Sequence, residues 1–217
     1  MNKFIIAFTK ITAFPVQFVC FRTKVHYEDR KVQGRHIKGP AIIVSNHTSI
    51  VDFAVFLFVF FGRTLRYQMA EVLFKRNKLL AWYLRKMGGI RVDRDLYNFS
   101  FVDKSVDVLK AGGIVGIFPE SRLPRPGEER PLPFRASAAL IAMKSDMPVI
   151  PVYTNGKYLK WQRARVIIGK PMYVNQYVDP SLKEKENVRK ISSIMRDKVL
   201  ELKDELERQT KEKKTTV

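Results

Sequence analysis

A short apolar run at residues 41–44 follows Pro40 and stops at the polar residues Ser45, Asn46 and His47. Its β-branched side chains and its length are typical of a buried strand. Similar runs alternate along the chain with helical patterns, which predicts an α/β domain with a mixed, largely parallel sheet flanked by helices. The predicted strands are 41–44, 114–118, 149–153 and 166–168, and the predicted helices are 53–61, 77–87, 100–110 and 136–144.

The C-terminal segment 181–217 has the pattern of a long amphipathic helix. Its apolar face is formed by Ile191, Met195, Val199, Leu202 and Leu206. A face at this spacing predicts packing against the rest of the chain. We therefore expect an N-terminal helical segment at residues 1–30, a domain at 31–180, and a C-terminal helix and tail at 181–217.

The chain is strongly basic, with 40 Lys and Arg against 21 Asp and Glu and a formal net charge of +19. Segment 181–217 holds 11 of these basic residues and 8 of the acidic ones, so most of the net charge belongs to residues 1–180. This excess predicts an anionic partner: nucleic acid, an anionic membrane, an acidic carrier protein or a phosphorylated substrate. Nucleic acid is not expected, because no zinc pattern or RNA-binding aromatic stretch is present. With one cysteine and three histidines, no Cys/His metal site is expected either.

The N-terminal stretch is mostly apolar from residue 4 to residue 21, but Lys10, Pro15 and Gln17 interrupt it. A membrane-spanning helix needs about 20 predominantly apolar residues with few charges. The stretch better fits one or two short amphipathic helices, broken at Pro15, that lie in a membrane surface. The alternative is a helix docked on its own domain. The basic residues that would meet anionic headgroups are Lys3, Lys10, Arg22 and Lys24.

His47 and Asp52 lie five positions apart, where a predicted strand gives way to a predicted helix. On one continuous helix they would point about 140° apart and could not touch. If the helix begins near Ser49, a plausible cap, the loop can fold His47 back onto the carboxylate. Asp52 would then orient the imidazole while its other nitrogen takes a proton from a substrate hydroxyl. The alternative is an ordinary helix-terminal acid beside a polar loop residue.

A glycine pair, Gly88-Gly89, precedes Arg91 and Arg94. Glycines allow close backbone approach, and arginine guanidinium groups suit bidentate binding of phosphate. This motif is weak by itself, because Gly-Gly after a helix is an ordinary helix end and surface arginines are common.

A third cluster follows the predicted strand 114–118, where Glu120 and Arg122 come directly after Pro119. Chemistry in parallel sheets collects beyond the carboxyl ends of strands, and His47 and Glu120 both lie there. A proline-rich loop then leads to Arg135 at the start of the next helix. The alternative is a turn with an exposed ion pair.

Pro151 lies inside the fourth motif, the apolar strand pattern 149–153. Proline cannot donate a backbone hydrogen bond, so it is tolerated at a sheet edge or bulge and not in a central ladder. We therefore expect this strand at an edge or at a bulge.

These four motifs, in this order, resemble those of the glycerolipid acyltransferase family, typified by 1-acylglycerol-3-phosphate acyltransferase. That family is marked by Asn-His-x-x-x-x-Asp, Gly-x-x-x-x-x-Arg, Phe-Pro-Glu-Gly-x-Arg and a proline-containing apolar strand. The resemblance spans roughly residues 35–175, and the first and third motifs are the diagnostic ones. The matching residues are Asn46, His47 and Asp52, then Gly88 or Gly89 with Arg94, then Phe118, Pro119, Glu120, Ser121 and Arg122, and last Val149, Ile150 and Pro151.

The chain departs from the family pattern at three places. Ser121 and Ser137 stand where the family usually has glycine. An Ala-Lys-x-Glu-like element often precedes the second motif, but here it is Met69-Ala70-Glu71-Val72, without the lysine. In the family that lysine is implicated in holding the acceptor's phosphate, so its absence keeps other lysolipids open as acceptors. The arginines that could compensate are Arg91, Arg94, Arg122 and Arg135.

The resemblance implies transfer of a fatty acyl group from a thioester to the sn-2 hydroxyl of 1-acyl-sn-glycerol-3-phosphate, which yields phosphatidic acid in phospholipid biosynthesis. It implies acyl-coenzyme A or an acylated acyl carrier protein as co-substrate, with no metal and no tightly bound cofactor. A lipid acceptor implies a peripheral or monotopic membrane protein on the cytoplasmic face. His47 and Asp52 would be catalytic, and the substrate-binding residues would be Asn46, Arg91, Arg94, Glu120, Ser121, Arg122 and Arg135.

Two other functions stay open from the sequence. An acyltransferase on the same scaffold could use another lysolipid or hydroxyl lipid as its acceptor. A non-enzymatic basic protein that binds a membrane would explain the charge, but it would explain neither the spacing of His47 and Asp52 nor the Phe-Pro-Glu motif.

Overall fold

The computed structural model describes residues 2–93, 99–158 and 163–215, with side chains up to residue 212. Its centre is a seven-stranded sheet in which every neighbouring pair is parallel except β6 and β7. The predicted mixed, largely parallel α/β fold is therefore confirmed. In spatial order the strands are β1 (Lys24–Tyr27), β7 (Arg165–Ile168), β6 (Val149–Thr154), β2 (Ala41–Ser45), β5 (Ile114–Ile117), β3 (Leu65–Ala70) and β4 (Ile90–Val92).

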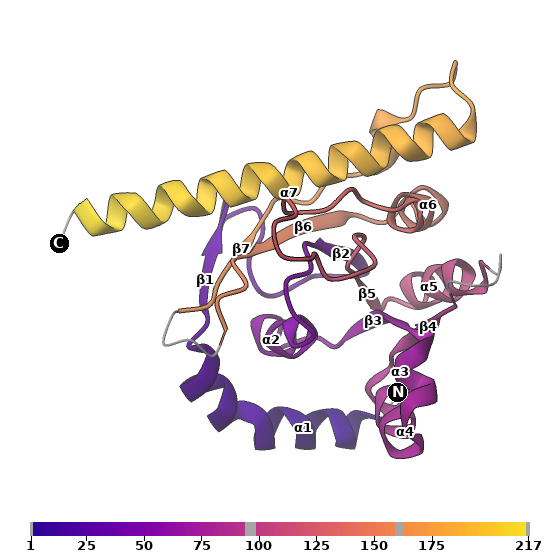
Figure 1. The fold of residues 1–217 in the computed structure, drawn as a ribbon. Coiled ribbons are helices and arrows are strands. Elements are labelled where there is room, and N and C mark those ends of the chain that lie inside the picture. The colour runs from indigo at the N-terminus through magenta and orange to yellow at the C-terminus, as the bar shows by residue number, and fades with distance from the viewer. Residues whose placement is uncertain (1, 94–98, 159–162, 216–217) are drawn as a thin grey trace.

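Helices cover both faces of the sheet and bury a separate core on each (Figure 1). One face carries α5 (Ser100–Lys110), α6 (Ala136–Ser145) and the long α7 (Glu184–Thr215). The other face carries α2 (Asp52–Val59), and α1 (Lys3–Val16) lies beyond α2 as a further layer. Strands β2 and β5 are buried along their whole length, as strands covered on both faces must be.

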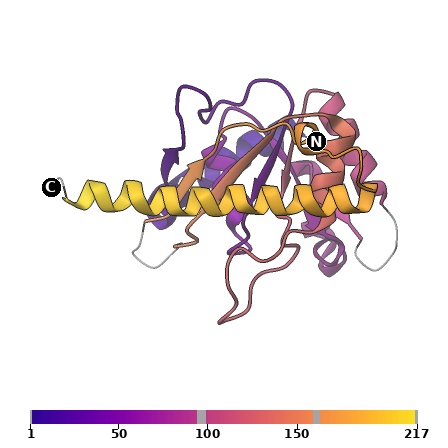
Figure 2. The same ribbon diagram turned by 90° about the horizontal axis from the view of Figure 1, so that it is seen from above.

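The C-terminal helix α7 lies across the sheet, as Figure 2 shows from above. All five apolar residues predicted for its face are buried, from Ile191 to Leu206. Each contributes apolar burial of the kind that holds an amphipathic helix on a domain. Helix α7 thus packs on the same body as the sheet, and a 3-10 turn, η2 (Val174–Tyr177), lies between β7 and α7.

The N-terminal segment differs from expectation in two ways. Pro15 does not break it, because α1 continues into a π-helix, η1 (Gln17–Phe21), and Pro15 only precedes the change of helical form. The helical segment Lys3–Phe21 has the length and composition to cross a membrane. The expected boundary at residue 30 is also too late, because Lys24–Tyr27 already forms the edge strand β1.

Three strands and a short helix were not predicted. β1 mixes Lys and His with apolar residues, β3 alternates between buried and half-buried side chains, and β4 has only three residues. Weak patterns of this kind acquire strand structure from pairing with a neighbour. The short helix α3 (Glu71–Arg76) is followed directly by α4 (Lys78–Met87), whose cap Asn77 accepts hydrogen bonds from the amides of Leu79 and Leu80.

The expectation for Pro151 is wrong in one respect, because β6 lies inside the sheet between β2 and β7. Pro151 pairs with Val44 on the β2 side. On the other side its carbonyl accepts a hydrogen bond from Gly169, just beyond the end of β7. Pro151 has no N–H to donate on this side, and the pairing of β6 with the chain after β7 resumes at Val149 and Met172.

Candidate active site

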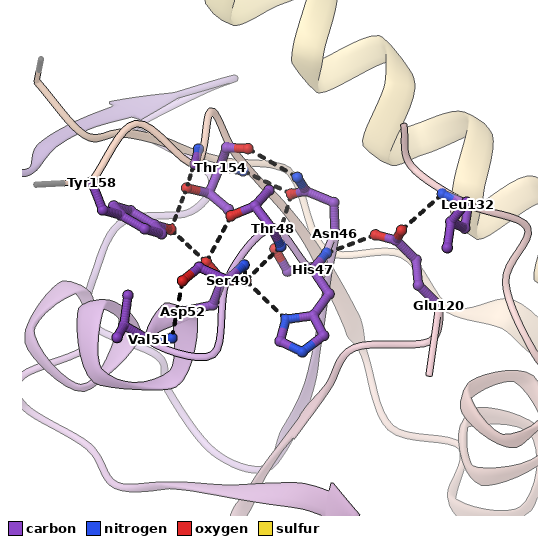
Figure 3. Close-up of polar contacts among 12 residues, drawn as sticks. Asn46, His47, Thr48, Ser49, Val51, Asp52, Glu120, Leu132, Thr154 and Tyr158 are labelled. Carbon is purple, nitrogen blue, oxygen red and sulfur yellow. Dashed lines mark hydrogen bonds and ion pairs between the residues drawn. The ribbon is translucent and has the colours of Figure 1, made fainter. Parts of the chain in front are cut away.

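His47 and Asp52 meet beyond the carboxyl end of β2 (Figure 3). The Nδ1 atom of His47 lies 2.9 Å from Oδ2 of Asp52. Asp52 is fully buried, whereas the side chain of His47 is 21% exposed. The predicted contact is therefore made, and its outer partner is the imidazole, which a substrate can reach.

Asp52 accepts hydrogen bonds from the loop that precedes α2. Its Oδ2 also accepts hydrogen bonds from the backbone amides of Thr48 (2.7 Å) and Ser49 (2.9 Å). Its Oδ1 accepts from the hydroxyls of Thr48 and Tyr158, at 2.9 and 2.7 Å. Helix α2 begins at Asp52 itself, so Ser49 is not the helix cap that we expected. The carboxylate holds the preceding loop instead, and this folds His47 back.

The hydrogen bond between His47 and Asp52 indicates which ring nitrogen of His47 carries a proton. An ionised carboxylate only accepts hydrogen bonds, so Nδ1 of His47 must carry the proton that lies toward Asp52. In the neutral imidazole, Nε2 then keeps a lone pair. Such an arrangement is suited to a general base, because the buried carboxylate would stabilise the imidazolium that forms.

Tyr158 is a contributor to the site that sequence reasoning missed. Its hydroxyl donates to Asp52 and lies 2.8 Å from Oγ1 of Thr154, at the end of β6. Burial, and then the charge of Asp52, raise the pKa of Tyr158, so it stays a hydrogen-bond donor. Gly156 lets this loop close, because a Cβ there would lie 2.6 Å from Cβ of Thr48. The sequence signal that could have indicated this role is the tyrosine at position 158, shortly after the fourth motif.

A stack of aromatic rings packs against the imidazole of His47. Phe118 stacks on His47 with ring centroids 4.4 Å apart, and Tyr67 stacks on the far side of Phe118 at 5.5 Å. Tyr67 fits against β5 only because residue 116 is glycine, since a Cβ there would lie 2.3 Å from the tyrosine ring. The hydroxyl of Tyr67 is buried without a hydrogen-bond partner, and burial raises the pKa of Tyr67 well above its ordinary value.

Glu120 joins the end of β2 to the loop that follows β5. Its Oε1 accepts a hydrogen bond from the amide of His47 at 2.6 Å, and its Oε2 accepts one from the amide of Leu132 at 2.8 Å. The side chain is buried, which raises the pKa of Glu120, while the two amide bonds oppose that effect. The structure thus places Glu120 beside His47, as predicted, with both oxygens bonded to backbone amides.

Asn46 is buried and bonded at both ends of its amide group. It donates to the carbonyl of Thr154 at 2.9 Å and accepts from the amide of Thr154 at 2.8 Å. Asn46 therefore ties β2 to β6 and sets the point where His47 leaves the sheet.

The described part of the glycine–arginine motif lies apart from the dyad. Arg91 is exposed on the edge strand β4 and forms an ion pair with Glu71. With Arg66, Arg85 and Lys104 it lines a hollow of about 450 Å³ that does not include His47. Arg94 lies outside the described residues.

The residues after Glu120 turn toward solvent. Ser121 has φ +61°, a left-handed conformation that favours glycine, which is the residue the family motif has there. Arg122 follows it directly, one place earlier than in Phe-Pro-Glu-Gly-x-Arg, and its guanidinium donates two 2.7 Å hydrogen bonds to Glu128. Arg135 is exposed just before α6, and its amide donates to the carbonyl of Pro119.

The chain is similar to known proteins in sequence and in structure. A protein 28% identical over 171 residues is the 1-acyl-sn-glycerol-3-phosphate acyltransferase of Bacillus subtilis, with 76% of this chain and 82% of that protein covered. The enzyme of the same name from Limnanthes alba is 26% identical, and the match covers 76% of this chain and 59% of that protein. The crystal structure of the 1-acyl-sn-glycerophosphate acyltransferase PlsC from Thermotoga maritima superposes with a TM-score of 0.57 and 27% identity, over 93% of this chain and 79% of that one.

The family model described as Acyltransferase matches residues 22–155. That range contains the loop from β2 to α2, the glycine–arginine motif, Glu120 and the strand β6, and it ends three residues before Tyr158. The buried Asp52, the partly exposed imidazole and the strand-end position agree with this match, and the chain belongs to the acyltransferase family.

Proposed function

We propose that this protein transfers a fatty acyl group from a thioester to the sn-2 hydroxyl of 1-acyl-sn-glycerol-3-phosphate. The observation that carries the proposal is the 2.9 Å contact between His47 and a fully buried Asp52, which leaves Nε2 of His47 free. The relatives from Bacillus subtilis and Limnanthes alba and the Thermotoga maritima structure carry the name of this activity. The product would be phosphatidic acid.

In the proposed reaction, His47 takes the proton of the acceptor hydroxyl as its oxygen attacks the thioester carbonyl carbon. The C–S bond then breaks, and His47 returns the proton to the departing thiolate. The amides of His47, Thr48 and Ser49 are already bonded to Glu120 and Asp52, so they are not free to bind the oxyanion. Other donors near the strand ends must supply that stabilisation.

The donor would be coenzyme A or an acyl carrier protein, since both are anionic thioester carriers and the chain has a net charge of +19. The acceptor remains in the membrane by its acyl chain, so we place the protein on the cytoplasmic membrane surface. The helical segment Lys3–Phe21 supports this placement, because only 17% of its most apolar stretch is buried within the protein.

A second candidate is the same transfer to another lysolipid. It is favoured by Arg91 and Arg122, which bond to Glu71 and Glu128 rather than converging on His47. The test is thiol release by the full chain with one acyl donor and a panel of acceptors: lysophosphatidate, lysophosphatidylglycerol, lysophosphatidylcholine and monoacylglycerol. We expect the largest kcat/KM with lysophosphatidate. An equal or larger value with an acceptor that lacks the phosphomonoester would overturn the proposed acceptor and leave the transfer chemistry intact.

A further inference from the structure

Most of the large hydrophobic side chains that the described residues expose lie on two elements. One is the helical segment α1–η1, and the other is the pair α3–α4 at the far edge of the sheet. A concentration of this kind marks a surface that contacts a partner or a membrane. On α1–η1 the residues are Phe4, Phe8, Ile11, Phe14, Val16, Phe18 and Val19, and on α3–α4 they are Val72, Leu73, Leu79 and Trp82.

Helix α1 lies flat along the domain and does not project from it. Phe4, Phe8 and Ile11 recur at helical spacing on its outer side, and Phe4 is 76% exposed. On its inner side Ile6 is buried, and Lys10 donates a 2.6 Å hydrogen bond to the carbonyl of Phe61. A helix fixed in this way presents a continuous apolar stripe along its length.

Helix α4 has two apolar sides, although only one of them packs against the protein. Ala81, Leu84 and Met87 form the buried side. On the outer side Leu79 is 72% exposed and Trp82 is 48% exposed. A helix that faces water carries polar residues on its outer side, so these two side chains need another explanation.

The two elements form one face of the molecule. The amide of Asn2 donates to the carbonyl of Lys86 at 2.9 Å, and the hydroxyls of Thr9 and Tyr83 lie 3.1 Å apart. Figure 1 shows α1 and α4 along the same lower side, with α7 on the opposite side. The exposed apolar side chains of α1 and of α4 therefore lie on adjoining helices.

The charge of α3–α4 indicates what covers this face. Residues 71–87 contain five Lys and Arg and one acidic residue, Glu71, which is already paired with Lys75 and Arg91. The exposed cations Arg76, Lys78 and Arg85 border Leu79 and Trp82. Apolar side chains surrounded by lysine and arginine, with a tryptophan among them, match the boundary of a bilayer with anionic lipids.

We propose that α3–α4 is a second membrane-contacting element, which together with α1 seats the domain on an anionic lipid surface. Leu79 and Trp82 enter the boundary between headgroups and acyl chains, and the surrounding cations contact lipid phosphates. The choice of a membrane as the partner of this face rests partly on the proposed lipid substrate. The contact between α3–α4 and the membrane does not depend on which acceptor is used. Two membrane-contacting elements would fix the orientation of the domain on the membrane, whereas contact through α1 alone would leave its tilt variable.

The chain contains two tryptophans, Trp82 and Trp161, so Trp161→Phe leaves Trp82 as the only indole reporter. We expect vesicles of phosphatidylglycerol and phosphatidylcholine to shift its emission to shorter wavelength. Lipids brominated on the acyl chain should quench it. Binding measured by co-sedimentation without any blue shift or quenching of Trp82 would overturn the proposal, because α1 would then be the only contact.

The contribution of the cations is tested by Arg76→Glu/Lys78→Glu, with Lys185→Glu/Lys190→Glu on the opposite side as a control of equal charge. A cation near an anionic surface changes partitioning by roughly fivefold, so we expect the first variant to bind at least 25-fold more weakly at low salt. The control should lose much less, and the difference should shrink as salt is added. Equal losses in the two variants would contradict a local contact.

A second copy of the chain is the other possible occupant of this face. In that case Trp82 emission would be blue-shifted without vesicles and would depend on protein concentration, which would overturn the membrane assignment. These measurements need no substrate. A protein that binds vesicles through Trp82 but does not acylate lysophosphatidate would support this inference and refute the proposed function.

Discussion

In the structure His47 and its neighbours are held differently from Arg91 and Arg122, although the sequence predicted one site from the residues around His47 and the substrate-binding arginines. Asp52, Glu120 and Asn46 are buried, and each makes at least two hydrogen bonds to backbone amides or carbonyls. Arg91 and Arg122 are exposed and bond to acidic side chains on the surface. In the proposed function the fold would therefore set the proton-transfer geometry, whereas acceptor recognition would depend on side chains that can reorient when a ligand replaces Glu71 or Glu128.

This difference orders the expected effects of substitution. Replacements in the buried part remove a group that the fold cannot replace, so they should change kcat or stability strongly. Replacements among the exposed arginines break solvated ion pairs, so they should change mainly the KM of the acceptor.

Asp52→Asn should have the largest of these effects. The amide cannot accept hydrogen bonds at both ends, so His47 loses the partner that fixes its tautomer, and kcat should fall by about 10³–10⁴-fold. Steady-state thiol release measures this, and circular dichroism checks that the fold is retained. A kcat within tenfold of the wild-type value would show that Asp52 only stabilises the loop.

Glu120→Gln should act first on stability. One end of the new amide would face a backbone N–H instead of accepting from it, and an unsatisfied buried donor costs about 1–3 kcal/mol of unfolding free energy. Because burial raises the pKa of Glu120 above its ordinary 4.5, the folded state binds the proton more tightly than the unfolded state. The wild-type contribution is therefore greatest below pH 4.5 and declines as the pH rises through the folded-state pKa.

Urea unfolding of the wild type and Glu120→Gln at pH 4 and pH 7 measures both effects. The stability advantage of the wild type should be larger at pH 4. An advantage that grows from pH 4 to pH 7 would mean that the two amide bonds outweigh burial, and that Glu120 is stabilised as the anion.

Tyr158→Phe should reduce kcat by about tenfold, because it removes one hydrogen bond to a charged, buried acceptor. Asp52 would keep its bonds to the loop amides, so the fold should be retained. Steady-state thiol release measures the loss of kcat, and circular dichroism checks the fold. An unchanged kcat with a lower melting temperature would show that Tyr158 serves packing alone.

Arg122→Ala should have the smallest effect on the chemical step, with kcat within about threefold of the wild type. The guanidinium bonds to Glu128 on the surface, so its removal leaves the dyad in place. The KM of a phosphate-bearing acceptor should rise more than that of an uncharged acceptor. A fall in kcat comparable to that of Asp52→Asn would contradict the division between the two parts of the site.

Sequence patterns predicted the parts of this molecule whose structure is locally determined. The run 41–44, the helix 100–110 and the apolar face of α7 each follow one local sequence pattern, either that of a buried strand or that of an amphipathic helix. The strands β1 and β3 were missed because their mixed side chains become strand only beside β7 and β5. Pro151 was misplaced for a related reason, since its position depends on how β6 pairs with the chain after β7.

The candidate site divides in the same way. The meeting of His47 and Asp52 could be predicted because five positions of local chain determine it. The role of Tyr158 could not, because Tyr158 is brought to Asp52 from 106 positions away. The place of Glu120 beside His47 was expected from the strand ends, but its two bonds to backbone amides were not. The pairing of Arg122 with Glu128 also depends on the turn at Ser121. That residue has a positive φ, which a serine in a sequence does not predict.

The most direct test of the account is the rate of thiol release by His47→Ala beside the wild type, with lysophosphatidate in anionic vesicles. The imidazole makes one side-chain hydrogen bond in the structure and its removal leaves the strand-end bonds of Asn46 and Glu120 in place. We predict a 10²–10⁴-fold loss of kcat with unchanged vesicle binding and an unchanged fold. A variant that released thiol at the wild-type rate would contradict the assignment of His47 as the base.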